Sequence, residues 1–293
     1  MIVIIGALVV FCSVIGGFCM GGGNPLNLLH PSEFVIICGA GAGAMMVMAP
    51  RKVLMDLVRM TTATLKGAPH SREAYNDLFK ALYELFMLGR RGGMVALEEH
   101  VMDPGASNIF AKYPTFQKET KAMEFLCNGL RPIIDGKIKP DHLKMLLEIE
   151  LEAMEEEHER PVGVLTKVAD AMPGFGIVAA VLGIVLTMSA ISGPIEQIGE
   201  KVGAALVGTF LGIFVSYGFM NPMAANIEFM NISEMAYIRC IAASVIGFAG
   251  GMSPIMAVEV ARRGLPSEVK PSADGLETML KALNQTQAQA PGK

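Results

Sequence analysis

Four long stretches of this 293-residue chain lack Asp, Glu, Lys, Arg and His altogether: 1–29, 34–50, 171–195 and 202–227. A helix needs about 20 apolar residues to cross roughly 30 Å of hydrocarbon. Apolar residues make up 52% of the chain and cluster in these stretches, which excludes one ordinary soluble domain. The sequence therefore predicts an all-α membrane protein with four transmembrane helices, near 2–20, 34–50, 173–193 and 202–220.

Signatures of enzymes and of metal or nucleic-acid binding are also missing. The five histidines follow no HExxH-type spacing, and the net charge of −4 gives no nucleic-acid signal. No nucleophile–base set or phosphate loop is recognisable. The five cysteines show no CxxC pattern, which excludes a disulfide framework or zinc site: Cys12, Cys19, Cys38, Cys127 and Cys240. We expect no enzyme activity, no metal, no cofactor and no nucleic-acid partner.

Basic residues predict the topology. The connection between the first two helices has no Lys or Arg, and the connection between the last two has only Lys201. Basic residues instead flank the central segment: Arg51, Lys52, Arg59, Arg160 and Lys167. Because such residues stay on the cytoplasmic side, both termini and 51–170 are expected to be cytoplasmic. The first helix has no basic n-region and exceeds an h-region in length, so we expect it to be retained.

The sequence divides into five predicted segments. Hairpins of membrane helices occupy 1–50 and 171–222, and the cytoplasmic helical domain between them occupies 51–170. Within that domain, Tyr75, Leu78, Leu82, Leu85 and Phe86 recur at helical spacing, Gly92-Gly93 loosens the helix, and a later helix is expected to end at Pro161. Cytoplasmic helices follow at 223–275, with a disordered Gln-rich tail at 276–293. The uncharged segment 240–258 fits a fifth span or, as we favour, a helix pair packed on the domain.

Inside the four predicted spans the strongly polar side chains are few: Ser13, Thr187, Ser189, Ser192, Thr209, Ser216 and Tyr217. Most Ser and Thr residues in such places only hydrogen-bond a neighbouring helix. Transporters usually retain an ionisable residue within the membrane despite its cost, and none is expected here. Either the chain is a scaffold, or a partner supplies the ionisable group.

Small residues and two prolines mark the third and fourth spans. Glycine and alanine recur in both, including the pair Gly208 and Gly212 of a GxxxG motif, so these spans are expected to pack closely and the first two to be peripheral. Pro173 and Pro222 fall at the same predicted membrane face, where they either end helices or act as paired hinges. In the cytoplasmic domain Arg90 and Arg91 precede Glu98 and Glu99, a patch that fits a solvated surface or a contact site.

Several motifs resemble the MotA family, the stator subunits of the bacterial flagellar motor. The resemblance covers residues 1 to about 270 and rests on "ALVVFCSVIGGFCMGGG", "SEFVIICGAGAGA", "GGMVALEEHVMDP", "AMPGFGIVAAVLGIV" and "GAALVGTFLGIFVSYGFMNPMA". It implies about five copies in the lipid of the bacterial inner membrane, around two copies of a MotB-type partner whose single Asp binds the travelling ion. The missing carboxylate is then expected, because the ion site is shared.

The resemblance also implies roles for individual residues. Pro173 and Pro222 match the family's paired prolines, which link ion occupancy to subunit movement. Arg90 and Glu98 match residues that engage charges on the rotor protein FliG, with Arg91 as an alternative register. Glu150 lies where the family often carries an acidic residue.

The resemblance bears on ion choice as well. Sodium-driven relatives tend to carry Thr seven residues after the first proline, where this chain has Ala180. Because hard cations prefer oxygen ligands, this favours protons over sodium, although Thr187 and Thr209 still offer oxygens. The alternatives are an ExbB/TolQ-like subunit that energises outer-membrane transport, and a membrane scaffold without ion flow. The extra hairpin at 1–50 disfavours the ExbB/TolQ-like reading.

Overall fold

The computed structural model describes residues 2–65, 67, 70–189 and 191–289. All regular structure over these residues is helical, with no strand. The chain forms two compact units, each built from two separate parts of the sequence. The first unit contains 1–67 and 157–231, and the second contains 68–156 and 232–293.

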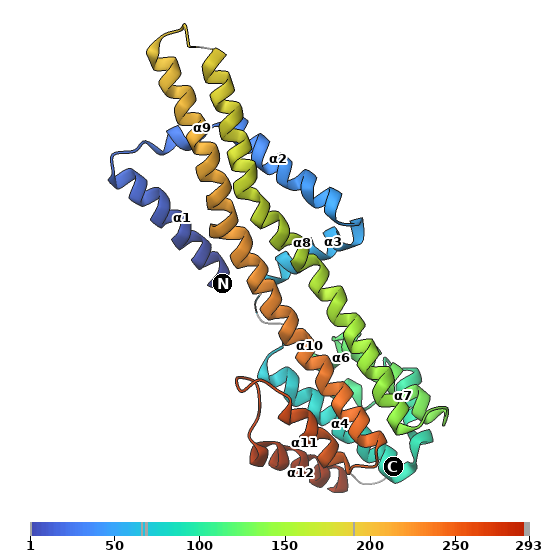
Figure 1. Cartoon of the computed structure of the whole chain (residues 1–293). Helices are drawn as coiled ribbons and strands as arrows, with labels where there is room; N and C mark the ends of the chain where they lie inside the picture. The colour runs from blue at the N-terminus through green and yellow to red at the C-terminus, as the bar shows by residue number, and fades with distance from the viewer. Residues whose placement is uncertain (1, 66, 68–69, 190, 290–293) are drawn as a thin grey trace. The chain divides into compact units, whose positions relative to one another are not determined.

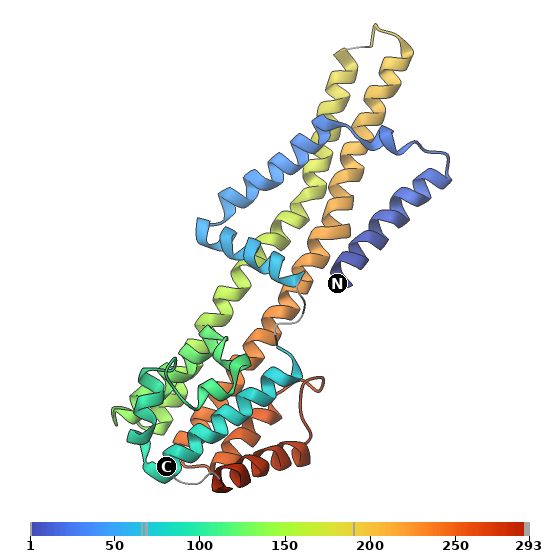
Figure 2. The same ribbon diagram turned by 180° about the vertical axis from the view of Figure 1, so that it is seen from behind.

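The first unit contains the apolar helices (Figure 1). Along the chain they are α1 (Ile2–Met20), η1 (Pro25–Leu28), α2 (Pro31–Met48), α3 (Arg51–Thr64), the later part of α8 (Pro140–Ser189), α9 (Ile195–Val215), the π-helical turn η4 (Ser216–Met220) and the start of α10 (Asn221–Ala249). Each predicted span lies in a helix long and apolar enough to cross a membrane. In Figures 1 and 2, α8 and α9 run side by side, flanked by α1 and α2.

Helix α2 begins earlier than the sequence suggested. Pro31 opens it, and proline is favoured at a first helical position because its φ is already helical and its missing N–H needs no partner there. Glu33 therefore lies in the first turn and is buried, with 4% of its surface exposed. The helix that contains the second predicted span therefore also carries a buried carboxylate, one residue before the predicted start at 34.

Helix α8 runs without interruption through two prolines. It extends over 50 residues and contains both Pro161 and Pro173, so the predicted helix end at Pro161 is wrong. Pro222 likewise lies inside continuous helix, at the second position of α10. Of the two readings for Pro173 and Pro222, helix termination is excluded.

Two small apolar clusters hold the first unit together. One joins Ile37, Val168, Met172, Ala179 and Leu211, and the other joins Leu57, Leu165, Ala224 and Ile227. The second cluster places α3 and the residues from 157 onward in this unit. The predicted domain 51–170 is therefore divided, because the apolar faces at both of its ends pack with the first unit rather than with the middle of the domain.

The second unit has the larger core. It contains α4 (Arg72–Gly92), η2 (Met94–Leu97), α5 (Glu98–Met102), η3 (Phe110–Lys112), α6 (Pro114–Gln117), α7 (Thr120–Ile134), the first part of α8, the end of α10, α11 (Pro254–Arg263) and α12 (Ala273–Gln289). Every residue of the predicted apolar face of α4 is buried, and α4 ends beside Gly93, whose φ of +79° favours glycine.

The end of the chain is more ordered than expected. The segment 240–258 forms the end of α10 and the start of α11, which turn at Gly251 (φ +88°), and Ile241, Val245 and Val258 enter the core of the second unit. The predicted helix pair is confirmed as part of that unit. The disordered tail is wrong over the described residues, because Leu276 and Leu280 bury α12 against the same core.

Candidate functional site

Helices α8 and α9 approach until their backbones touch. A Cβ atom added at Gly176 would lie 2.8 Å from the carbonyl oxygen of Gly208, and one added at Gly212 would lie 2.6 Å from that of Met172. Both distances are shorter than real Cβ contacts, so only glycine fits at these crossings. The small-residue faces predicted for these helices are therefore the surfaces on which they pack.

The predicted ion-pathway residues lie along this helix pair. The amide nitrogen of Ala180 and the Cα of Thr209 border the crossings, at 3.4 Å and 3.3 Å from Cβ atoms built at Gly208 and Gly176. Ala180 and Thr209 therefore lie at a similar level on facing helices. Thr187 lies two turns further along α8, is buried, and donates its hydroxyl proton to the carbonyl of Gly183 at 2.8 Å.

A hydrogen bond between helices lies at Pro173. In a regular helix the N–H of residue 173 would donate to the carbonyl of Ala169, but proline has no N–H. The hydroxyl of Ser216 instead donates to that carbonyl at 2.6 Å, and Ser216 and Ala169 are both 0% exposed. The carbonyl released by the proline is thus satisfied from the other helix.

The same serine opens the π-helical turn that precedes Pro222. Turn η4 spans Ser216–Met220, and such turns inside longer helices are common at functional sites. The side-chain amide of Asn221 lies 3.4 Å from both the Ser216 hydroxyl and an Asp170 carboxylate oxygen. Pro173 on one helix and Pro222 on the other are therefore connected through Ser216 and Asn221.

The charged residues predicted to contact a rotor lie in the second unit. Arg90 and Arg91 are exposed in the last turn of α4, and Glu98 is exposed at the start of α5. The break at Gly93 separates the two helices, so Arg91 and Glu98 do not share a face of one continuous helix. Glu150 is half-buried, and burial, with a smaller contribution from Glu124, raises the pKa of its carboxyl group.

Two residues were missed or undervalued by sequence reasoning. Ser216 was treated as one of several ordinary polar residues, although its position before Pro222 on a helix facing Pro173 was a usable signal. Glu33 lies one residue before the predicted second span at 34–50, which leaves it in the connecting loop by sequence alone. A proline two residues before a charge is a common helix start, and that signal would have placed Glu33 inside the helix.

Comparisons with known proteins agree over nearly the whole chain. The model of the motility protein A N-terminal region matches residues 4–93, and that of the MotA/TolQ/ExbB proton channel family matches residues 117–238. Motility protein A of Escherichia coli (strain K12) is 34% identical over 289 residues, covering 99% of this chain and 98% of that protein. Chemotaxis protein LafT of Vibrio parahaemolyticus is also 34% identical, covering 94% of this chain and 97% of that protein.

Solved structures share the fold. The structure of C. jejuni MotAB matches with a TM-score of 0.74 at 22% identity, over 91% of this chain and 96% of that chain. The flagellar MotAB stator complex from Bacillus subtilis matches with a TM-score of 0.71 at 23% identity, over 94% and 98%. The fold is therefore shared along almost the full length of each chain.

Proposed function

This chain belongs to the motility protein A (MotA) family, and from that premise we propose that it is a stator subunit of a bacterial flagellar motor. With a MotB-type partner it forms a proton channel and converts proton flow into torque on the rotor protein FliG. The observation that carries the proposal is the full-length similarity to motility protein A, combined with the connection between Pro173 and Pro222 in the structure.

The proposed arrangement is a ring of about five copies around two partner chains in the inner membrane. Four helices span the membrane, and both termini and the second unit are cytoplasmic. The side of the α8–α9 pair that bears Ala180 and Thr209 is the path for the ion, to which the partner contributes its Asp. Ala180 offers no side-chain oxygen to a dehydrated sodium ion, which supports the proton as the travelling ion.

Proton binding at the partner's Asp removes a charge from a site of low dielectric, where charge is costly. The balance of forces on the surrounding subunits then changes. The α8–α9 pair responds by bending at Pro173 and Pro222, where backbone hydrogen bonds are already absent. Movement of the second unit shifts its exposed charges, Arg90 and Glu98 among them, relative to those of the rotor.

The test of this function is rotation. The chain is expressed with its cognate MotB-type partner in a compatible strain that lacks its own MotA-type subunit, and tethered cells are followed with and without sodium. We expect rotation in both buffers. Rotation only with sodium would retain the stator and refute proton coupling, whereas an assembled complex that never rotates would favour ExbB/TolQ-like transport or a scaffold.

The prolines provide a sharper test in the same cells. Pro173→Ala and Pro222→Ala are each expected to leave the complex in the membrane and to abolish torque. Pro161→Ala is the matched control, since Pro161 also lies inside α8 but outside the predicted spans. Equal loss of rotation in all three variants would show that any change of helix geometry is harmful, and would refute a specific hinge role.

The rotor contact is tested by charge reversal. Arg90→Glu is expected to slow rotation, and reversal of an acidic residue on the rotor protein is expected to restore part of the speed. Arg91→Glu is the control for register, because both side chains are exposed at the same helix end. If no rotor reversal rescues either variant, the electrostatic contact is refuted.

A further inference from the structure

Glu33 is a buried carboxyl group without an adequate partner. Only 4% of its surface is exposed, and its Oε2 atom has no hydrogen-bond partner among the described residues. Its Oε1 atom accepts a long bond of 3.4 Å from the hydroxyl of the adjacent Ser32. Most buried polar atoms in proteins are hydrogen-bonded, so an exception such as Oε2 needs an explanation.

The free oxygen lies against the α8–α9 crossing. A Cβ atom added at Gly208 would be only 2.9 Å from Oε2 of Glu33, and 3.1 Å and 3.4 Å from Cβ of Ala179 and the amide nitrogen of Ala180. The carboxyl group thus fits in a notch that exists because residue 208 has no side chain. That notch lies at the level of Ala180, on the helix pair that the proposed function assigns to the ion path.

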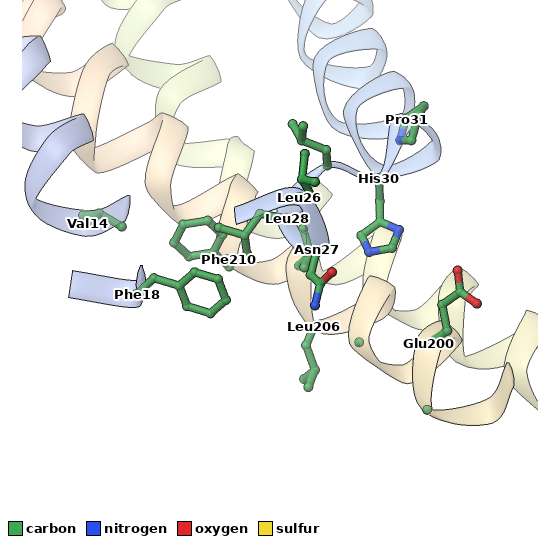
Figure 3. A pocket seen from close by; sticks show the side chains of 14 residues that line it. Val14, Phe18, Leu26, Asn27, Leu28, His30, Pro31, Glu200, Leu206 and Phe210 are labelled. Atoms are coloured by element: carbon green, nitrogen blue, oxygen red, sulfur yellow. The ribbon is translucent and has the colours of Figure 1, made fainter. Parts of the chain in front are cut away.

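A cleft is lined by residues that are close in sequence to Glu33 and Gly208. It has a volume of about 940 Å³ and is lined by residues of α1, the η1 segment and α9, among them His30, Pro31 and Val207 (Figure 3). His30 and Pro31 shortly precede Glu33 in the sequence, and Val207 directly precedes Gly208. The asparagine, histidine and glutamate side chains labelled in Figure 3, Asn27, His30 and Glu200, give the cleft polar groups that can hold water.

The surroundings determine which cation a carboxylate could hold here. An isolated carboxylate away from water costs several kcal/mol, so the group needs a positive partner. Oε2 of Glu33 accepts no hydrogen bond from any described residue. The titratable residues on the elements nearest to it are His30 before α2, Glu200 and Lys201 on α9, and Lys167 and Asp170 on α8. A metal ion requires several oxygen ligands, and no acidic, His or Cys cluster able to hold one occurs among the described residues. A proton requires only the one oxygen.

We propose that Glu33 is a proton-binding site of this subunit, and that the proton it holds lies on the conduction path. A hydrated proton (H3O+) transfers its proton to Oε2 and leaves a neutral water molecule, so the carboxyl group becomes neutral. The proton later passes to the next acceptor, which restores the carboxylate. The position on the path rests on the proposed function; the binding of a proton at Glu33 does not.

Infrared spectroscopy of the purified complex tests the binding itself. A protonated carboxylic acid has a carbonyl stretching band that shifts in heavy water, and we expect one such band to disappear in Glu33→Gln, which keeps the size of the side chain. The partner's Asp contributes equally to both spectra and cancels in the difference. A difference spectrum without this band at any pH would refute the site.

Gly208 and Gly203 provide a matched pair for the notch. Gly208→Ala places a Cβ where Oε2 lies and is expected to shift or remove the Glu33 band, whereas Gly203→Ala adds a Cβ with nothing within 4 Å and is expected to leave it unchanged. An unchanged band in both variants would place the carboxyl group outside the notch and overturn the geometry.

Rotation tests the position on the path. Glu33→Gln is expected to assemble normally but to rotate the motor at a small fraction of the wild-type speed, and that remaining speed should not depend on external pH. Glu33→Asp is expected to retain part of the wild-type speed. Normal speed and pH dependence in Glu33→Gln would remove Glu33 from the path. A wild type that does not rotate would refute the proposed function, and the infrared difference would still decide the proton site.

Discussion

Replacing Ser216 by alanine tests the connection between the two prolines. The hydroxyl of Ser216 supplies the hydrogen bond to the Ala169 carbonyl that Pro173 cannot supply, in a place where neither residue is exposed. Leaving a buried polar group unsatisfied costs about 1–3 kcal/mol, and side-chain hydrogen bonds within membranes average about 0.6 kcal/mol with a maximum of about 1.7. We expect Ser216→Ala to lower the free energy of unfolding by about 1–2 kcal/mol, a factor of about 5–30 in the equilibrium.

The assay is a double-mutant cycle by equilibrium unfolding in detergent micelles. Pro173→Ala restores an N–H that can donate to the Ala169 carbonyl within α8. In that background Ser216→Ala should therefore cost much less, leaving an interaction energy of about 1 kcal/mol. Independent sites add to within about 0.3–0.5 kcal/mol, so additive costs would refute the account.

Ser244 is the control for the loss of a buried hydroxyl. It is 0% exposed, like Ser216, but its Oγ atom has no hydrogen-bond partner among the described residues. Ser244→Ala is expected to be neutral or slightly stabilising, since it removes an unsatisfied polar atom. Equal destabilisation by both serine variants would show that packing, not the bond to Ala169, explains the effect.

Three further changes test the packing and electrostatics. Gly212→Ala should destabilise the α8–α9 pair by about 1–3 kcal/mol or more in the same unfolding assay, because its Cβ would meet backbone atoms; Gly199→Ala, in open space, should not. Leu280→Ala should lower the free energy of unfolding by about 2–5 kcal/mol and make α12 easier for a protease to cleave, because Leu280 is buried. A variant that resists the protease as well as the wild type does would contradict that burial. Hydrogen bonds from Arg262 hold the pKa of Glu259 at about 2, so the stability advantage of wild type over Glu259→Gln should be complete above about pH 4.5 and vanish as pH falls towards 2; a pH-independent advantage would refute this.

The sequence was sufficient for the features that depend on periodicity and length. Uninterrupted apolar stretches predicted four helices that are long and apolar enough to cross a membrane, and the spacing from Tyr75 to Phe86 predicted the buried face of α4. Glycine recurrence predicted the packing faces of α8 and α9. These signals are local, so tertiary contacts did not need to be known.

The failures came from residues whose fate depends on distant partners. Pro161 and Pro173 are helix breakers by local rules, yet α8 continues through both, and at Pro173 the lost bond is replaced by Ser216 from another helix. Leu276 and Leu280 lie in a polar, Gln-rich segment whose composition indicates disorder, but a core formed by other helices buries them. Glu33 fits against α9 where residue 208 is glycine, a contact between helices that its local sequence does not reveal.

The split composition of the second unit has a consequence for biosynthesis. Its core joins residues such as Tyr75 and Leu147 with Tyr237 and Leu280, so the complete core can form only after most of the chain has been made. From Leu147 to Tyr237 the ribosome must add 90 residues, about 5–18 s at typical rates of about 5–20 residues per second. During that interval α4 can pack on η2 and α6, which precede Leu147, but it lacks α11 and α12, its partners from the last part of the chain. A chain that ends before residue 237 would therefore leave uncovered the part of α4 that contacts α11 and α12, and during synthesis a chaperone could shield that part.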